Sequence, residues 1–116
     1  MIPRIIHQVF VQSDSFPRIP TGWEHARQAV LEHHPGYRHV LWTGEDMDRF
    51  MQTHYPSFYR TFKSYKYLIQ QIDAFRYFVL YHYGGIYLDL DIGTKRPMDR
   101  YLNHDLVLVK SMNVPS

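Results

Sequence analysis

The sequence predicts a single α/β domain, or a large piece of one, with a mostly parallel sheet and flanking helices. Two observations favour this class. Short apolar runs alternate with segments of helical periodicity, which is the pattern of parallel sheets. The chain has 116 residues, of which 45% are hydrophobic and 16% aromatic, enough to bury one core. In sheets of this kind ligands bind beyond the carboxyl ends of the strands.

Four elements are expected in the first half of the chain. In order, they are a strand over residues 5–11, a helix over 21–33, a strand over 37–42 and a helix over 43–55. Thr21 and Glu24 fit a capping box at the start of the first helix. His33 and His34 lie near the end of that helix, where we expect a solvated pair rather than zinc ligands.

The longest helix is predicted over residues 67–83. Its apolar side chains are spaced to face a core, and they are Leu68, Ile69, Ile72, Phe75, Val79 and Leu80. Gly84 and Gly85 end the helix, because glycine accepts the left-handed conformation that a helix end requires. A strand over 86–88 then leads into Asp89-Leu90-Asp91, and a final strand is expected over 106–109.

Composition excludes several classes of protein. The net charge of +2 is too small to indicate a nucleic-acid partner, and the absence of cysteine rules out disulfides and thiolate metal sites. No run approaches the roughly 20 apolar residues that a membrane helix needs. The first four residues also lack the plan of a signal peptide. We therefore expect any membrane anchor to lie outside this chain.

Asp89 and Asp91 form the first candidate site. In extended backbone, residues two apart point to the same side, so both carboxylates are directed into one small volume at a strand end. A hard divalent cation would relieve their repulsion. The same cation could bridge the oxygens of a diphosphate and neutralise its charge as it leaves. The alternative for this motif taken alone is a solvated pair of acids.

Asp73 and Arg76 share a face of the long helix, because they are three residues apart. Asp73 could accept hydrogen bonds from sugar hydroxyls, while Arg76 addresses a phosphate or sugar oxygen and orients Asp73. A local ion pair is the alternative. Phe10, at the end of the first strand, could stack on a nucleobase, and Trp42 has the same possibility, although for each residue taken alone a place in the core is favoured. No residue stands out as a general base or nucleophile.

The order of these signals is more specific than any one of them. Four blocks, at residues 2–10, 41–43, 73–80 and 84–91, resemble the D-x-D glycosyltransferases of the family 32 type. That family includes fungal initiating α-1,6-mannosyltransferases and the catalytic subunits of mannosyl-inositol-phosphoceramide synthase. Residues 65–69 and 82–87 are most similar to the inositolphosphoceramide mannosyltransferases. The resemblance covers nearly the whole chain.

The resemblance implies a GT-A (Rossmann-like) fold, a GDP-mannose donor, Mn²⁺ or Mg²⁺, and retention of anomeric configuration. By motif position, Asp91 would be the principal metal ligand. Asp89 would contact the donor ribose or sugar and reach the metal through water. Asp73 and Arg76 would hold the transferred sugar. Phe10 would stack on the base, in place of the tryptophan found in relatives.

The family also implies partners that the residues do not specify. They are a glycolipid or glycan acceptor, with inositol phosphoceramide expected, and a regulatory membrane subunit. The location would be the lumenal side of the Golgi membrane, or the cytoplasm for a bacterial or viral protein. Relatives continue past the D-x-D block with acceptor-binding segments. Residues 1–116 are therefore expected to be the N-terminal, nucleotide-sugar-binding part of the domain, incomplete at the C-terminus.

Two other functions compete with sugar transfer. The first is a non-catalytic fragment that binds a nucleotide-sugar without completing transfer. The second is a phosphatase of the haloacid-dehalogenase type, in which the two aspartates would act as nucleophile and acid. That motif requires Thr or Val two residues after the second aspartate, where this chain has Gly93. The sequence therefore disfavours the phosphatase.

Overall fold

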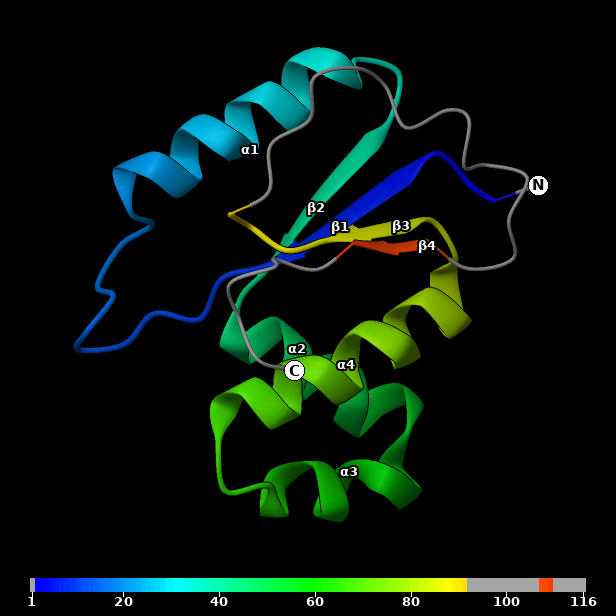
Figure 1. Cartoon of the computed structure of the whole chain (residues 1–116). Helices are drawn as coiled ribbons and strands as arrows, with labels where there is room; N and C mark the ends of the chain where they lie inside the picture. Colours follow the sequence, from blue (N-terminus) through cyan, green and yellow to red (C-terminus); the bar gives the residue numbers. More distant parts are fainter. Residues whose placement is uncertain (1, 92–106, 110–116) are drawn as a thin grey trace.

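A computed structural model describes residues 2–91 and 107–109. The elements in chain order are β1 (Ile5–Val9), α1 (Thr21–His33), β2 (Arg38–Trp42), α2 (Gly44–His54), α3 (Pro56–Ser64), α4 (Leu68–Tyr83), β3 (Ile86–Leu88) and β4 (Val107–Val109). The strands form one sheet in the order β2-β1-β3-β4, and every pair is parallel (Figure 1). The predicted α/β class with a parallel sheet is confirmed. Within the described ranges, no helix is long and apolar enough to cross a membrane.

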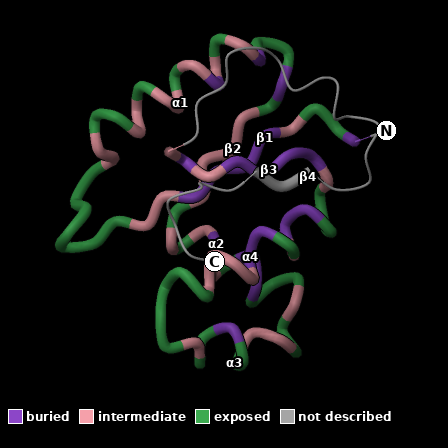
Figure 2. Tube along the Cα trace, viewed as in Figure 1, coloured by how far each residue is buried: buried purple, intermediate pink, exposed green. Residues whose placement is uncertain are grey.

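The core lies on both faces of the sheet, as the buried segments in Figure 2 show. On one face, Ile6 of β1 and Ile86 of β3 pack with Val30 of α1. On the other face, Val9 and Tyr87 belong to a larger cluster formed mainly with α2 and α4. This alternation follows from the strand period of two residues. Because Tyr87 faces α4, Asp89, two residues later, emerges on the side of that helix.

The turn from α4 into β3 requires glycine at two consecutive positions. Gly84 and Gly85 have φ angles of 72° and 98°, a region that other residues rarely adopt. A Cβ atom on Gly85 would also lie 2.5 Å from the carbonyl oxygen of Ile5. The helix stop predicted at Gly84 is confirmed, and the close approach at Gly85 lets β3 pair directly with β1.

The capping box predicted for α1 is wrong. Pro20 is the N-cap residue, and Thr21 is already the first helical residue. Glu24 does not reach back to the cap, because its carboxylate accepts hydrogen bonds from Arg27 and Gln28 on the following turn. A capping box does occur in α2, where the Thr43 hydroxyl accepts from the backbone nitrogen of Asp46 at 3.2 Å and the Asp46 carboxylate accepts from the backbone nitrogen of Thr43 at 3.0 Å.

Three other expectations are corrected. His34 is fully buried rather than solvated. Its Nδ1 forms a hydrogen bond with the carbonyl oxygen of Val30 at 2.7 Å, which satisfies the buried ring nitrogen. The sequence predicts only that a helix ends before Pro56. In the structure Pro56 is instead the first residue of the helix α3, which the sequence does not predict. Leu68 and Ile69 do not face a core but are 42% and 39% exposed.

His7 joins three parts of the fold at the centre of the sheet. Its ring is 1% exposed, its Nε2 donates to the carbonyl of Gly84 at 2.9 Å, and its Nδ1 accepts from the indole nitrogen of Trp42 at 3.1 Å. This pattern requires the neutral tautomer with the proton on Nε2. Burial, with a smaller contribution from the charge of Arg38, lowers the pKa of His7 below its usual value of 6.5 despite the Gly84 hydrogen bond.

We predict that stability falls on acidification because of His7. Above pH 6.5 the ring is neutral in both states. As the pH falls from that value toward the lowered pKa of the folded protein, only the unfolded chain gains the proton, so the free energy of unfolding decreases. Urea unfolding at about pH 7.5 and about pH 5.5 measures this slope. The variant His7→Gln should show a smaller slope, and an identical slope in both proteins would contradict the account.

Candidate functional site

The candidate residues meet at the carboxyl edge of the sheet. β3 ends at Leu88, so Asp89 is the first residue beyond the strand. The helix α4 leads into β3 through a tight turn, and its N-terminal half therefore returns alongside the carboxyl end of that strand (Figure 1). Asp73 and Arg76 lie on that half of α4. The fold thus brings together three residues that the sequence separates by up to 16 positions.

Arg76 is the centre of this cluster. Its side chain is 3% exposed, and its guanidinium contacts the carboxylate of Asp73 through Nη2. Its Nη1 lies 3.7 Å from Oδ1 of Asp89, which links α4 to the end of β3. The pairing of Asp73 with Arg76 follows from their spacing, whereas the contact with Asp89 was not predicted. A buried guanidinium between two carboxylates is held in a fixed orientation.

The ring of Tyr87 lies against the guanidinium of Arg76, and the sequence analysis did not identify Tyr87 as a candidate. The guanidinium carbon lies 6.0 Å from the centre of the Tyr87 ring, a favourable arrangement for a cation. Burial, together with the nearby charge of Asp89, raises the pKa of the Tyr87 hydroxyl, which stays protonated. The two-residue interval between Tyr87 and Asp89 could have identified Tyr87, because residues two apart in a strand lie on the same side of the chain.

Arg76 also has an unused donor. Its Nε is buried and has no hydrogen-bond partner within the described ranges. Buried polar groups normally have one, because leaving a donor unsatisfied costs about 1–3 kcal/mol. An unpaired guanidinium nitrogen beside two carboxylates is typical of a site that is completed by a further oxygen-bearing group.

Asp91 differs from Asp89 in its surroundings. It is half-buried, and no cationic side chain of the described part of the chain lies within ion-pair distance of it. The strand ends at Leu88 and Asp91 lies in a turn, so the extended backbone predicted through Asp91 is not observed. Carboxylate oxygens are suitable ligands for Mn²⁺ or Mg²⁺. In the part of the chain that can be described, no group of three acidic or histidine side chains could hold a metal. The pair therefore fits a cation only if other ligands complete its coordination, as the oxygens of a diphosphate or water molecules would.

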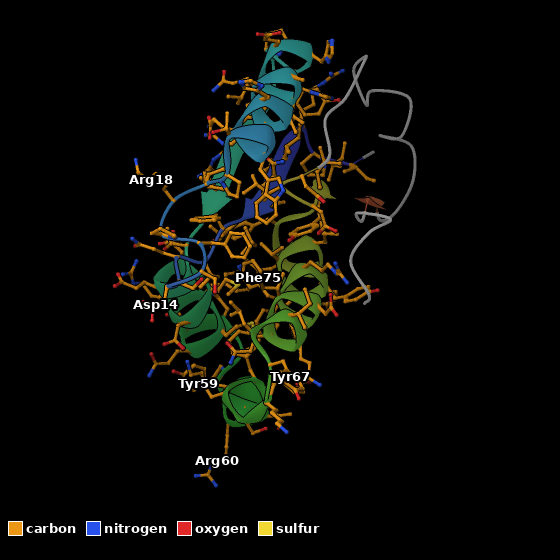
Figure 3. The ribbon with its side chains drawn as sticks, turned by 60° about the vertical axis from the view of Figure 1, so that its left-hand side comes forward. Asp14, Arg18, Tyr59, Arg60, Tyr67 and Phe75 are labelled. Carbon is orange, nitrogen blue, oxygen red and sulfur yellow. The ribbon has the colours of Figure 1, made fainter. Side chains whose placement is uncertain are left out.

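Phe10 lies at a second part of the same edge. Its backbone nitrogen donates to the carbonyl of Trp42 at 2.9 Å, just beyond the pairing of β1 with β2. The ring lines an open pocket of about 740 Å³ whose other walls include Arg18, Glu24 and Glu45. Figure 3 shows Arg18 on the loop between β1 and α1. Arg18 was not predicted, because loop side chains carry no periodic signal, and Glu45, in the first turn of α2, was not singled out either.

Trp42 is partly buried and packs against the core. Its ring packs against Phe50 at a centroid distance of 5.5 Å and against Phe75 at 5.1 Å. The indole nitrogen is used by His7. Trp42 also lines two smaller pockets, of about 250 and 80 Å³, so Phe10 differs from it in lining the larger pocket and in leaving the core contacts to Trp42.

The fold and the site together indicate a class of protein. A parallel α/β sheet with a buried arginine held between carboxylates at its carboxyl edge, and with Phe10 of the same edge lining an open pocket, has an arrangement typical of nucleotide-binding proteins. The family model described as "Glycosyltransferase sugar-binding region containing DXD motif" matches residues 20–113, and the chain belongs to this family. It is a glycosyltransferase family, so sugar transfer is favoured over the phosphatase alternative.

Curated relatives give the same class. The chain is 46% identical over 111 residues to mannosyl phosphorylinositol ceramide synthase CSH1 of Saccharomyces cerevisiae, covering 96% of this chain and 28% of that protein. It is 46% identical over 103 residues to inositol phosphoceramide mannosyltransferase 3 of Schizosaccharomyces pombe, covering 89% of this chain and 28% of that protein.

A more distant relative is the initiation-specific alpha-1,6-mannosyltransferase of Candida albicans, 24% identical over 109 residues, covering 91% of this chain and 28% of that protein. No solved structure matches. The chain thus spans less than a third of the length of these three relatives. The resemblance noted in the sequence is confirmed at the level of the family, which implies a nucleotide-sugar donor and usually a divalent metal.

Proposed function

We propose that this chain is the donor-binding part of a mannosyltransferase that transfers mannose from GDP-mannose to a hydroxyl group of inositol phosphoceramide. The observation that carries the proposal is the buried Arg76, held between Asp73 and Asp89 at the carboxyl edge of the sheet. The names of the relatives at 46% identity support the acceptor and the sugar. The family description supports the nucleotide-sugar donor.

Each residue has a role that its surroundings permit. Phe10 stacks on the nucleobase, since it lines the open pocket beyond β1. Asp73 accepts hydrogen bonds from hydroxyl groups of the transferred sugar. Asp89 contacts the ribose or the sugar, because its carboxylate is already oriented by Arg76. Asp91 is the principal ligand of Mn²⁺ or Mg²⁺, which supplies positive charge to the diphosphate when it is bound.

Arg76 contributes most of the electrostatic stabilisation that the chain itself provides. Its position is fixed before the donor binds, so little reorganisation is needed as negative charge develops on the leaving diphosphate. The site positions the donor for transfer with retention of configuration. No residue of this chain is assigned as a nucleophile or a general base.

The assembled enzyme is proposed to work at the lumenal face of the Golgi membrane with a regulatory membrane subunit. Neither proposal rests on side chains of this site. Both are what the resemblance of the sequence motifs to the inositolphosphoceramide mannosyltransferases implies.

We predict that donor binding is selective and depends on metal. A thermal-shift panel of GDP-mannose, UDP-glucose and UDP-galactose, each with Mn²⁺ or with a chelator, measures both properties. GDP-mannose with Mn²⁺ should raise the melting temperature, because a ligand that binds only the folded state stabilises it. A larger shift with a UDP-sugar would contradict the donor assignment. A shift with GDP-mannose but no release of GDP in the presence of acceptor would identify the non-catalytic alternative.

A further inference from the structure

The end of the molecule formed by α3 and the start of α4 exposes side chains that a soluble surface normally lacks. Tyr67, Leu68 and Ile69 are consecutive and are 57%, 42% and 39% exposed. Figure 2 shows the exposed stretch between α3 and α4. With Arg60 and Lys66, these residues form what we call the α3–α4 tip. The helical periodicity of Leu68 and Ile69 predicts burial, so three consecutive exposed apolar side chains mark a candidate contact surface.

The tip is also positively charged. Arg60 and Lys66 have no acidic side chain within ion-pair distance in the described residues, whereas Lys63 nearby is paired with Asp48 at 3.0 Å. The ammonium group of Lys66 lies 5.3 Å from the centre of the Tyr67 ring. In Figure 3, Arg60 extends away from the body of the protein and Tyr67 lies at the start of α4. Both cations are thus free to meet an anionic surface.

The tip lies close to the candidate site. Ile69 and Asp73 are one turn apart on the same face of α4, which separates them by about 6 Å along the helix axis. The N-terminal half of α4 is the half that lies beside Asp89. Anything that the tip contacts is therefore held next to the residues proposed to handle the sugar.

We propose that the α3–α4 tip docks on the surface of a membrane that contains anionic lipids. Two cations meet the negative headgroups, Tyr67 lies at the depth of the headgroups, and Leu68 and Ile69 enter the boundary of the acyl chains. We favour lipid over an apolar protein partner because Lys66 adjoins the apolar run and Arg60 extends from the neighbouring helix α3, and cations beside a tyrosine and aliphatic side chains are typical of a surface that contacts a membrane. Docking presents the headgroup of a lipid to the carboxyl edge of the sheet.

This inference goes beyond the proposed function, because lipid docking does not depend on the identity of the donor. It makes the chain itself part of the membrane contact, although none of its described helices crosses a bilayer. Two cations and two aliphatic side chains form a small contact, so the affinity should be modest and should fall as salt is added.

The test is co-sedimentation of the purified protein with vesicles of phosphatidylcholine, with and without phosphatidylserine. The parent should bind the mixed vesicles and not the neutral ones. The double variant Arg60→Gln, Lys66→Gln should bind about 25-fold more weakly, since each cation near an anionic membrane contributes about a fivefold effect. Leu68→Ser should weaken binding about tenfold by removing the inserted apolar group.

Tyr81→Ser is the matched control. Tyr81 is 83% exposed on the same helix but lies about 20 Å from Leu68 along the axis, and its loss should leave binding unchanged. The melting temperature and its shift with donor should be the same in all variants, which separates this result from a failure of the proposed function. Equal binding to both vesicles, or full binding by the double variant, would overturn the proposal. Capture of a protein by the tip in place of lipid would do the same.

Discussion

Replacing Arg76 by methionine is expected to lower the free energy of unfolding by about 3 kcal/mol and to abolish sugar transfer. Methionine fills similar volume but leaves the carboxylates of Asp73 and Asp89 close together without the cation between them. Removing one partner of a buried ion pair is costly, because the remaining charge is left without compensation. Urea unfolding at neutral pH measures the loss, and release of GDP from GDP-mannose measures the activity.

Arg27→Met provides the control for this prediction. Arg27 also pairs with an acid three residues away, Glu24 at 3.2 Å, but both side chains are partly exposed to solvent. Exposed pairs of this kind contribute at most about 1 kcal/mol. If the two methionine variants lose equal stability, the central position of Arg76 in the cluster is refuted. The variant Arg76→Lys should be intermediate, because it keeps the charge but loses the planar group that reaches both carboxylates.

Replacing Asp91 by asparagine is expected to reduce the metal-dependent rate of transfer about a thousandfold while leaving stability almost unchanged. The rate falls because the cation would be held less firmly where charge develops on the diphosphate, an effect of several kcal/mol. Stability is preserved because Asp91 is only half-buried and has no cationic partner in the described part of the chain. Initial rates over a range of Mn²⁺ concentrations, with a melting curve of each protein, measure both quantities.

Asp89→Asn separates the roles of the two aspartates. Asp89 is 3.7 Å from Arg76, so its replacement should lower stability as well as rate. Asp14→Asn, in an exposed loop labelled in Figure 3, should change neither. A loss of stability in Asp91→Asn equal to that in Asp89→Asn would contradict the assignment of Asp91 to the metal.

The sequence predicted the fold class and most of the helices and strands, but it predicted helix caps and helix starts less well. Apolar runs and glycine stops identified every strand described here and three of the four helices, because burial and backbone freedom are strong local signals. The first strand ends at Val9, two residues earlier than expected, and the last is described only from Val107. The helix α3 was missed because proline is compatible with both the end and the beginning of a helix. The N-cap residue of α3 is Tyr55, whose side chain makes no capping hydrogen bond, so the start of this helix carried no capping signal in the sequence.

The candidate site was predicted in part. The D-x-D spacing and the helical pair identified Asp73, Arg76 and Asp89, and the structure brings these three together. The sequence could not show that Arg76 contacts Asp89, since that contact joins elements whose relative position depends on tertiary packing. It also could not distinguish Phe10 from Trp42. Each lies at the end of a strand and is partly buried, but Phe10 lines the larger pocket, whereas Trp42 packs against the core and lines smaller pockets.

The most direct test of the central claim is a calorimetric titration of GDP-mannose into the parent protein and into Asp91→Asn, each with Mn²⁺ and with a chelator. We predict that the parent binds the donor much more tightly with Mn²⁺ than with chelator, because cation and donor complete each other's contacts at the edge of the sheet. Asp91→Asn should lose most of that difference. The same Mn²⁺-dependent affinity in both proteins would show that Asp91 does not hold the metal, and the account of the site would be wrong.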